Sequence, residues 1–444
     1  MISHEVCGLA TKECGVPQWK CRNEERRVCP RQRGVTPALG AGTVMTIDDS
    51  TIAALSEECS NQVVEWRRQI HEHPEPGFQE SHTAELSAQV LHRLGLDVRS
   101  GIASTGLTAM LWGAYPGPTV ALRADMDALP ISEDTGLPFA SRVEGVMHAC
   151  GHDAHTAMLL GAATVLSRLR SQLHGNVKFI LQPSEERVGG AEPMIEAGVL
   201  RDPDVSAVFA AHVWPDVPYG CVHVHRGPAM ASLDEFTIQI RGRGGHVATP
   251  HKSVDAIVAA GFLISELQSV VSRELDPTEP AVVSIGRIEG GTVYNAIASD
   301  VSLHGTVRAV NPAIRTIIRD KMDDRLRGLA ASHGISYDFD YHLGYPPVVN
   351  SAEMADLVQS TAARILGAGR SAFAVRPSMV GEDFAYLIQE VPGAIYLLGV
   401  GDSDKCCYPL HHAKFNFNEG VLGIGVRVLV QIAVDCLSII GSAR

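Results

Sequence analysis

Residues 176–200 read NVKFILQPSEERVGGAEPMIEAGVL, and the pattern in this stretch decides the fold. The apolar run at 176–183 has the length and composition of a buried strand, and the segment at 191–200 is typical of a helix. A predicted helix at about 154–170 precedes this stretch, and a second apolar strand at 205–213 follows it. Strands that alternate with helices form sheets with helices on both faces. The sequence therefore predicts an α/β fold with a mixed, largely parallel sheet.

The same alternation extends on both sides of this stretch. It predicts helices at 50–72, 81–95 and 351–366 and from about 418, and strands at 119–122 and 394–400. Residues 229–342 follow another order, with strands and helices at 234–242, 253–274, 281–290, 300–309, 312–334 and 336–343. That β-α-β-β-α-β order is the ferredoxin-like arrangement, which folds as a compact unit. We expect a catalytic domain in two parts, 45–228 and 343–444, interrupted by an α+β domain at 229–342.

Composition disfavours both a nucleic-acid partner and insertion into a membrane. The 444 residues include 37 Lys and Arg against 50 Asp and Glu, a net charge of −13, which disfavours a nucleic-acid partner. The longest apolar run, near the end of the chain, is broken by Arg427 and Asp435, so we expect no membrane span.

Ten cysteines are present, and four of them (Cys7, Cys14, Cys21 and Cys29) lie in the first 44 residues. The other six are scattered, which indicates reduced thiols in a cytoplasmic protein. Residues 1–44 lack the apolar segment of a secretory signal and any Cys-x-x-Cys pair. We interpret them as a disordered tail, or as sequence upstream of the true start, in preference to a small metal-binding knot.

Residues capable of acid–base chemistry or metal binding follow several predicted strands. They are Asp125 and Asp127, then Cys150, His152 and Asp153, then Glu185 and Glu186, then His212, and finally His411 and His412. Each group alone is more often structural, as a helix cap, a solvated turn or a core histidine. Because the carboxyl ends of parallel strands meet at one edge of the sheet, the groups together indicate a single site.

A site of this composition suits a hydrolase with two metal ions. Divalent ions bind thiolate, neutral imidazole and carboxylate, and a pair of them polarises a carbonyl and activates water. Of the adjacent residues Glu185 and Glu186, one can bind metal while the other transfers the proton, because neighbouring side chains diverge.

Longer stretches carry a family resemblance, in the same order along about residues 60–425. They include RADMDALP (123–130), MHACGHDAHTAMLLGAA (147–163), QPSEER (182–187), AAHVWP (210–215), GRGGHVATPH (242–251), GEDFAY (381–386) and LHHAKFNFNE (410–419). On these motifs the sequence resembles the hippurate hydrolase and auxin-conjugate hydrolase group of dinuclear metallo-aminoacylases.

The resemblance implies two divalent ions, zinc or manganese, per subunit. It makes Glu185 the general acid/base and implies five ligands: Cys150, His152, Glu186, His212 and His411. The family continues with Asn or Ser and then Pro after the last ligand, where this chain has His412 and Ala413, so His411 and His412 both remain candidates. Asp125 and Asp127 are interpreted as partners that orient a ligand and its loop. Asp153 is expected to cap the helix that follows or to hold a ligand, and His155 to line the site without binding.

The resemblance extends to the inserted domain. It makes His246 the lid histidine that donates to the oxyanion, often across a dimer interface, so a homodimer through this domain is expected. Asn295 and Arg308 are implied to hold the carboxylate of the substrate, with Glu382 near the substrate or the metals.

The function implied is hydrolysis of an N-acyl amino acid, such as hippurate, an N-acetyl amino acid or an indole-3-acetyl conjugate, to an acid and an amino acid. A dipeptidase, an N-carbamoyl amino acid hydrolase and an inactive metal- or ligand-binding relative are the alternatives. The dipeptidase is disfavoured because Asp125 stands where such relatives place a metal-binding histidine.

Overall fold

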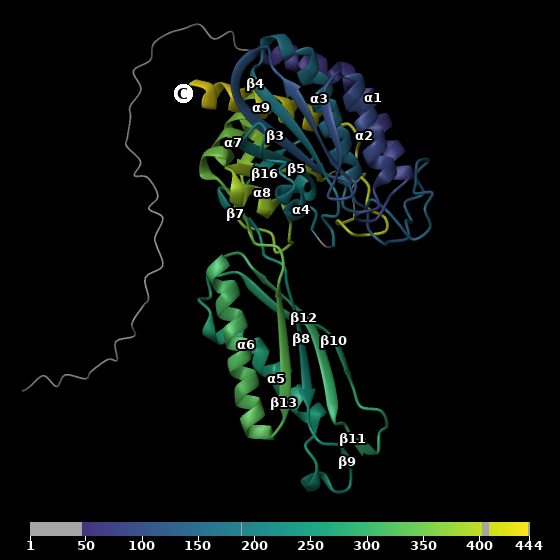
Figure 1. The fold of residues 1–444 in the computed structure, drawn as a ribbon, viewed down its shortest axis with the longest axis vertical. Helices are drawn as coiled ribbons and strands as arrows, with labels where there is room; N and C mark the ends of the chain where they lie inside the picture. The colour runs from purple at the N-terminus through teal and green to yellow at the C-terminus, as the bar shows by residue number, and fades with distance from the viewer. Residues whose placement is uncertain (1–46, 188, 402–407, 443–444) are drawn as a thin grey trace, which may run out of the picture. The chain divides into compact units, whose positions relative to one another are not determined.

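The computed structural model describes residues 47–187, 189–401 and 408–442 (Figure 1). The predicted tail at 1–44 and its four cysteines lie outside the described residues.

An eight-stranded sheet forms the centre of the larger domain. In spatial order its strands are β1 (Asp97–Ile102), β2 (Gly106–Trp112), β4 (His174–Gln182), β3 (Tyr115–Asp125), β5 (Val205–Pro218), β16 (Gly393–Gly401), β6 (Val222–Val224) and β15 (Ser371–Phe373). The central strands β4, β3, β5 and β16 are parallel, whereas β1 and β2 pair antiparallel with their neighbours. Strand β6 pairs antiparallel with β16 and parallel with β15. The predicted mixed, largely parallel sheet is confirmed, although the sequence did not predict β1, β2, β6 or β15.

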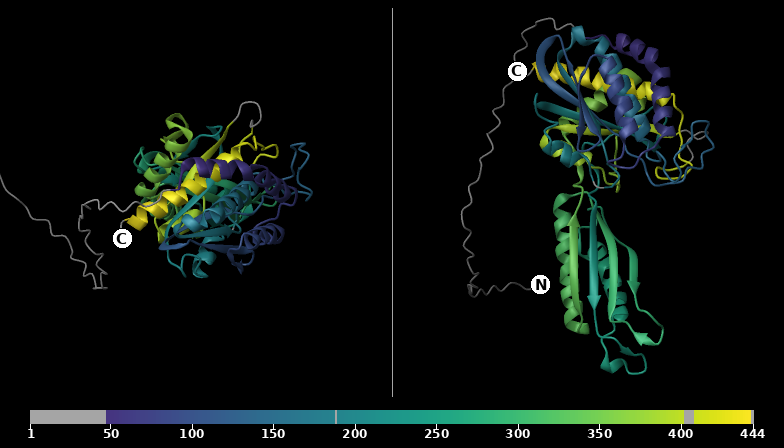
Figure 2. Two further views of the ribbon diagram at one scale, coloured as in Figure 1. Left: turned by 90° about the horizontal axis from the view of Figure 1, so that it is seen from above. Right: turned by 45° about the vertical axis from the view of Figure 1, so that its right-hand side comes forward.

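Helices cover both faces of this sheet, as Figures 1 and 2 show. Successive residues of a strand face opposite sides, so Leu122 packs in one core and Ala121 in the other. The first face is covered by α1 (Asp49–Glu72), α2 (Ser81–Arg93), α3 (His152–Arg168), α7 (Ala352–Leu366) and α9 (Val421–Ser442). The second face is covered by α4 (Ala191–Glu196) and α8 (Phe384–Glu390).

Helix α4 is shorter than the predicted 191–200. Gly198 has φ 83°, and the N–H groups of Gly198 and Val199 donate to the carbonyls of Ile195 and Met194. These bonds close the helix end in the way that a left-handed glycine permits.

The inserted domain has its own four-stranded antiparallel sheet. Its elements are β8 (Asp234–Arg241), α5 (Ala256–Ser269), β10 (Ala281–Gly290), β12 (Asp300–Ala309), α6 (Pro312–His333) and β13 (Ser336–Leu343). The strand order β10-β12-β8-β13 matches the predicted ferredoxin-like arrangement. Side chains such as Ile238, Leu303 and Leu326 form a separate apolar core. The domain limits themselves stay a prediction.

Within the described residues, two helices are long and apolar enough to cross a membrane by length and composition alone. Helix α9 is mostly buried and contacts α1, α3 and β3, as expected of a core helix. The other candidate, residues 256–274, includes α5. One side of α5 packs on the sheet of the inserted domain, called the lid domain below, and the other side exposes Ile257, Val258 and Phe262.

Candidate active site

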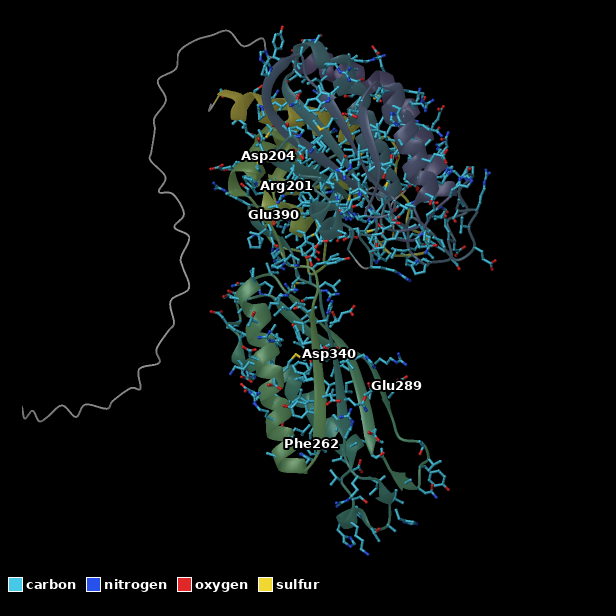
Figure 3. The ribbon with its side chains drawn as sticks, viewed as in Figure 1. Arg201, Asp204, Phe262, Glu289, Asp340 and Glu390 are labelled. Carbon is cyan, nitrogen blue, oxygen red and sulfur yellow. The ribbon has the colours of Figure 1, made fainter. Side chains whose placement is uncertain are left out.

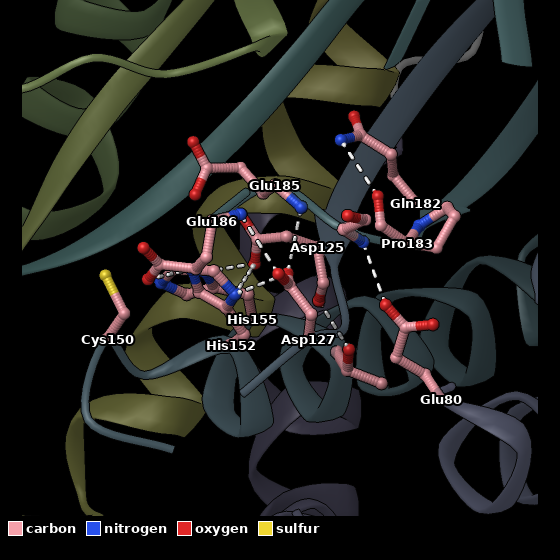
Figure 4. A network of polar contacts seen from close by, with 12 residues as sticks. Glu80, Asp125, Asp127, Cys150, His152, His155, Gln182, Pro183, Glu185 and Glu186 are labelled. Carbon is pink, nitrogen blue, oxygen red and sulfur yellow. Dashed lines mark hydrogen bonds and ion pairs between the residues drawn. The ribbon is translucent and has the colours of Figure 1, made fainter. Parts of the chain in front are cut away.

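The candidate residues of the larger domain gather where its central strands end. Asp125 closes β3 beside Gln182, the last residue of β4, and His212 lies in the adjacent strand β5. Figure 4 shows the loop residues Glu185 and Glu186 next to Asp127, His152 and Cys150. The parallel register therefore assembles residues that are far apart in the sequence, as predicted.

Cys150 and His152 flank the turn into α3. The prediction placed both on a loop, but His152 is the first residue of the helix and Gly151 precedes it. Gly151 has φ 87°, and a Cβ there would lie 2.4 Å from Cγ2 of Val213. Only glycine fits this tight, left-handed turn against β5.

Three side chains form a first group of possible metal ligands: Cys150, His152 and His212. Cys150 Sγ lies 3.6 Å from His212 Nε2. His212 Nδ1 donates to the carbonyl of Val213 at 2.7 Å, which leaves Nε2 as an unprotonated acceptor. His152 Nδ1 contacts Asp127 at 3.2 Å, whereas its buried Nε2 has no hydrogen-bond partner among the described residues. Such an orphaned nitrogen facing a thiol and a second imidazole suits a divalent cation.

A second group consists of Cys150, Glu186 and His411. Glu186 Oε1 lies 3.2 Å from His411 Nε2 and 3.8 Å from His152 Nε2. Cys150 belongs to both groups, so it would be within reach of an ion held by either one. The residues present fit a dinuclear centre.

His411 and His412 differ in what they contact. The backbone N–H of His411 donates to the Ala149 carbonyl at 2.8 Å, and its side chain faces Glu186. His412 Nδ1 accepts from the Lys414 N–H at 3.0 Å, and its ring stacks on Tyr408 with centroids 4.5 Å apart. This geometry favours His411 as the ligand.

Burial opposes ionisation of three side chains in the site: Cys150, Glu185 and His212. Burial, with the nearby charges of Glu186 and Glu185, raises the pKa of Cys150 well above its usual value. Burial, with Glu382 and Glu186, likewise raises the pKa of Glu185. Burial lowers the pKa of His212 well below its usual value and keeps its imidazole neutral. A bound cation would reverse these penalties on the thiol and the carboxylates.

Asp125 and Asp127 each contact a histidine, and only the histidine beside Asp127 is a candidate ligand. Asp127 accepts from the backbone N–H groups of Glu185 and Glu186, both at 3.0 Å, as well as facing His152. Asp125 lies 2.7 Å from His155 Nδ1, and His155 Nε2 accepts the Val213 N–H at 2.9 Å. Both nitrogens of His155 are occupied, so it has no free lone pair for a metal, and it is not among the residues that line the cavity described below.

The interpretation of Asp153 as a helix cap or a ligand's partner is wrong. Its side chain makes no cap bond in α3. Instead Oδ2 accepts from Arg67 Nε at 2.9 Å and lies 2.8 Å from His71 Nδ1, both in α1. Asp153 therefore fixes α3 to α1, because a buried carboxylate needs compensating charge.

A buried arginine that the sequence reasoning missed holds the acidic side of the site. Arg123 donates to Asp125 at 2.8 Å and to Glu382 and Asp383, each at 3.0 Å. Although burial acts in the opposite direction, these carboxylates raise the pKa of Arg123. The signal for it was present, since an arginine inside the apolar run TVALRAD requires buried acidic partners.

The site opens into a cavity of about 450 Å³. It is lined by the candidate residues Cys150, Glu185, Glu186, His212, Arg308, Glu382 and His411, and by Trp214, Met230, Leu233, Tyr345, Met379, Val380, Gly381 and Leu410. His246 and Asn295 are not among the lining residues. His246 is exposed in β9 (Gly245–His246) and pairs with Ala296 of β11 (Ala296–Ile297), so it lies beside Asn295. The structure thus brings Arg308 to the cavity of its own chain but not His246 or Asn295.

The fold and this pair of ligand groups define a metal-dependent hydrolase with a catalytic and a lid domain. Comparison with known proteins specifies the family: the chain belongs to peptidase family M20/M25/M40, whose family model matches residues 121–435.

Similar proteins agree with this assignment. The N-acyl-L-amino acid amidohydrolase of Geobacillus stearothermophilus is 43% identical over 303 residues, which cover 68% of this chain and 81% of that protein. N-acetylcysteine deacetylase of Bacillus subtilis is 40% identical over 380 residues, 85% of this chain and 98% of that protein. The Bacillus subtilis YXEP protein, a dinuclear metal binding peptidase from the M20 family, has a TM-score of 0.75 and 37% identity, with 86% of this chain and 99% of that chain covered. The chain is therefore a metal-dependent amidohydrolase of the aminoacylase type.

Proposed function

We propose that this enzyme hydrolyses N-acyl amino acids with an apolar, preferentially aromatic acyl group, such as benzoyl or indole-3-acetyl. The observation that carries the proposal is the composition of the cavity. Its apolar side chains include Trp214, Met230, Leu233, Met379 and Val380, next to the candidate ligands. Aromatic and thioether surfaces favour burial of a flat apolar group over a bare acetyl group.

The amino-acid end of such a substrate carries a carboxylate. Arg308 is the one Lys or Arg side chain among the cavity-lining residues, and a guanidinium suits a carboxylate because it can donate two parallel hydrogen bonds. We therefore assign the free carboxylate to Arg308.

The proposed ligands are Cys150, His152, Glu186, His212 and His411, with Glu185 as the general acid/base. Two bound ions would polarise the scissile carbonyl and facilitate deprotonation of water. Glu185 takes the proton from the attacking water and returns it to the leaving nitrogen. Burial and neighbouring carboxylates raise the pKa of Glu185, and a more basic carboxylate accepts a proton from water more readily.

Zinc or manganese is the proposed metal. The Cys150 thiol favours zinc, while the carboxylate and imidazole ligands also accept manganese. Metal analysis of protein purified without added metal, followed by chelation and add-back, distinguishes the two. A thiol ligand is best preserved in a reducing compartment, so the cytoplasm remains the expected location.

A homodimer through the lid domain is also proposed. Helix α5 exposes Ile257, Val258 and Phe262, the last labelled in Figure 3, and an apolar face of this kind suits a second copy. In the dimer, His246 and Asn295 of one chain would serve the cavity of the other, since they do not line their own. Sedimentation velocity of the full chain tests the dimer.

A substrate panel tests the proposed reaction. Release of free amine is measured with hippurate, N-acetyl amino acids, indole-3-acetyl amino acids, dipeptides and N-carbamoyl amino acids, with each metal present. We expect the highest kcat/KM with the aromatic acyl compounds. Preference for dipeptides or carbamoyl compounds would support those alternatives, and no turnover of any compound would support an inactive binding protein.

A further inference from the structure

The loop that carries Glu185 and Glu186 is held in an unusual conformation. Ser184 has φ 52°, which is uncommon for a residue other than glycine. This backbone conformation costs free energy, so it persists only where neighbouring groups enforce it. Glu80 accepts the Ser184 N–H at 2.8 Å, and Asp127 accepts the N–H groups of the two glutamates. These carboxylates, drawn in Figure 4, fix the donors of the loop.

The carbonyl of the Glu185 peptide is fixed by another residue. Tyr345 Oη donates to it at 2.7 Å, and the tyrosine is buried. The ring also lies against the end of the loop, since a Cβ on Gly189 would be 2.9 Å from Tyr345 Cε1. The peptide bond between Glu185 and Glu186 is therefore held at both ends: Tyr345 donates to its carbonyl, and Asp127 accepts its N–H.

Tyr345 belongs to the segment that returns from the lid domain, between β13 and β14 (Val348–Asn350). Its carbonyl accepts the N–H of Leu233, which lies in the outgoing connection between β7 (Gly227–Met230) and β8. The neighbouring Gly344 N–H donates to buried Asp234 at 3.1 Å. The two chain segments that connect the domains, one before β8 and one after β13, are therefore hydrogen-bonded to each other at Tyr345 and Gly344.

We propose that Tyr345 is a positioning residue, which orients Glu185 through its backbone carbonyl and links that orientation to the hinge of the lid. The proposal rests on the proposed role of Glu185. The hydrogen bond from the Tyr345 hydroxyl fixes the backbone of Glu185 and so restricts the direction of the Glu185 side chain. A small misplacement of a catalytic group lowers the rate of catalysis strongly. Movement of the lid would reach Glu185 through this contact.

The test compares Tyr345→Phe with Tyr386→Phe. Tyr386 is a matched control, because its hydroxyl donates to the Gly344 carbonyl at 3.4 Å and its ring meets that of Tyr345 edge-on at 6.2 Å. Tyr386 shares the hinge but has no hydrogen bond to the described residues of the loop that carries Glu185. We expect Tyr345→Phe to lower kcat by about 10-fold with KM within about 2-fold and metal content unchanged. Tyr386→Phe should resemble wild type.

A double variant separates positioning from a general structural effect. If Tyr345 acts through Glu185, then Tyr345→Phe should cause no further loss in a Glu185→Gln background. Wild-type kcat in Tyr345→Phe, equal losses in both tyrosine variants, or loss of metal would overturn the proposal.

Hydrogen exchange provides a readout that does not depend on the substrate. The Gly189 N–H donates to the Ser184 carbonyl at 3.1 Å, so peptides covering 184–190 report on the loop. Exchange should be faster in Tyr345→Phe than in wild type and unchanged in Tyr386→Phe. Unchanged exchange in both overturns the inference. Silence of the wild-type enzyme on the substrate panel would instead overturn the proposed function.

Discussion

The two domains differ in what they bury. Among the described residues of the lid, from β8 to β13, Asp234 is the one buried charged side chain, and the core is otherwise apolar. The larger domain buries Arg67, Arg123, Asp125 and Asp153 together with the candidate ligands. Because burial of charge opposes folding unless it is compensated, this contrast shows which domain gives up stability to hold a reactive site.

The largest expected effect is on turnover, after substitution of the proposed general base Glu185 in the larger domain. Glu185→Gln should lower turnover by about 100- to 10,000-fold, because it removes the proton carrier and leaves the shape of the side chain. Metal analysis should still find wild-type metal content. Glu192→Gln, at an exposed position of α4, is the control and should retain activity. Substantial turnover in Glu185→Gln would contradict the assignment.

The next effect separates the two ligand groups. Cys150→Ala should weaken the binding of both ions, because Cys150 is common to the two groups. The loss of affinity should be at least about 100-fold, since residues that only hydrogen-bond to a ligand already contribute about 10- to 100-fold. His212→Ala should weaken one ion only, since His212 belongs to the first group. Metal titration measures both. Loss of a single ion in Cys150→Ala would show that the thiol does not bridge.

A core substitution tests the apolar domain. Leu303→Ala, at a fully buried position of β12, should lower the free energy of unfolding by about 2–5 kcal/mol through loss of apolar contacts. Denaturant titration measures the loss. Metal content should not change, because the ligands lie in the other domain. Metal release at native conditions would show that the lid core supports the ligands after all.

The smallest effect is the pH dependence of stability in the charged domain. Although burial acts in the opposite direction, Asp153 and Glu133 raise the pKa of His71 to about 9. A raised folded-state pKa stabilises the protein below the unfolded value of about 6.5, and this contribution disappears as the pH rises through 9. The free energy of unfolding should fall by about 1–3 kcal/mol between these limits.

His71→Gln is the comparison for that measurement, because the amide keeps polarity but does not titrate. Its unfolding free energy should change less than that of wild type over the same range of pH. Parallel curves for the two proteins would exclude His71 as the source.

The strands of the lid domain were predicted from the sequence more accurately than those of the larger domain. In the lid, the predicted strands at 281–290, 300–309 and 336–343 match the observed bounds, since a purely apolar core leaves a clean periodic pattern. In the larger domain, the strands β1, β2, β6 and β15 were missed. Strand β1 is mostly exposed and β6 has three residues, so neither displays a buried apolar run.

The candidate site was predictable in its residue types but not in its contacts. The motifs indicated Cys150, His152 and Glu185, whereas Arg123 was not recognised as the partner of the buried carboxylates beside them. The expectation for Asp153 failed because local sequence favoured a helix cap, while α1 supplied an arginine and a histidine from far along the chain.

The sequence by itself determined the α/β class, the inserted ferredoxin-like order and the set of metal-capable residues, because hydrophobic periodicity and residue chemistry are local properties. The tertiary structure decided which of these residues meet. It placed His411 rather than His412 beside Glu186, left His246 outside the cavity of its own chain, and set Tyr345 against the peptide of Glu185. Such contacts depend on strand register and helix packing between distant segments, which no local pattern encodes.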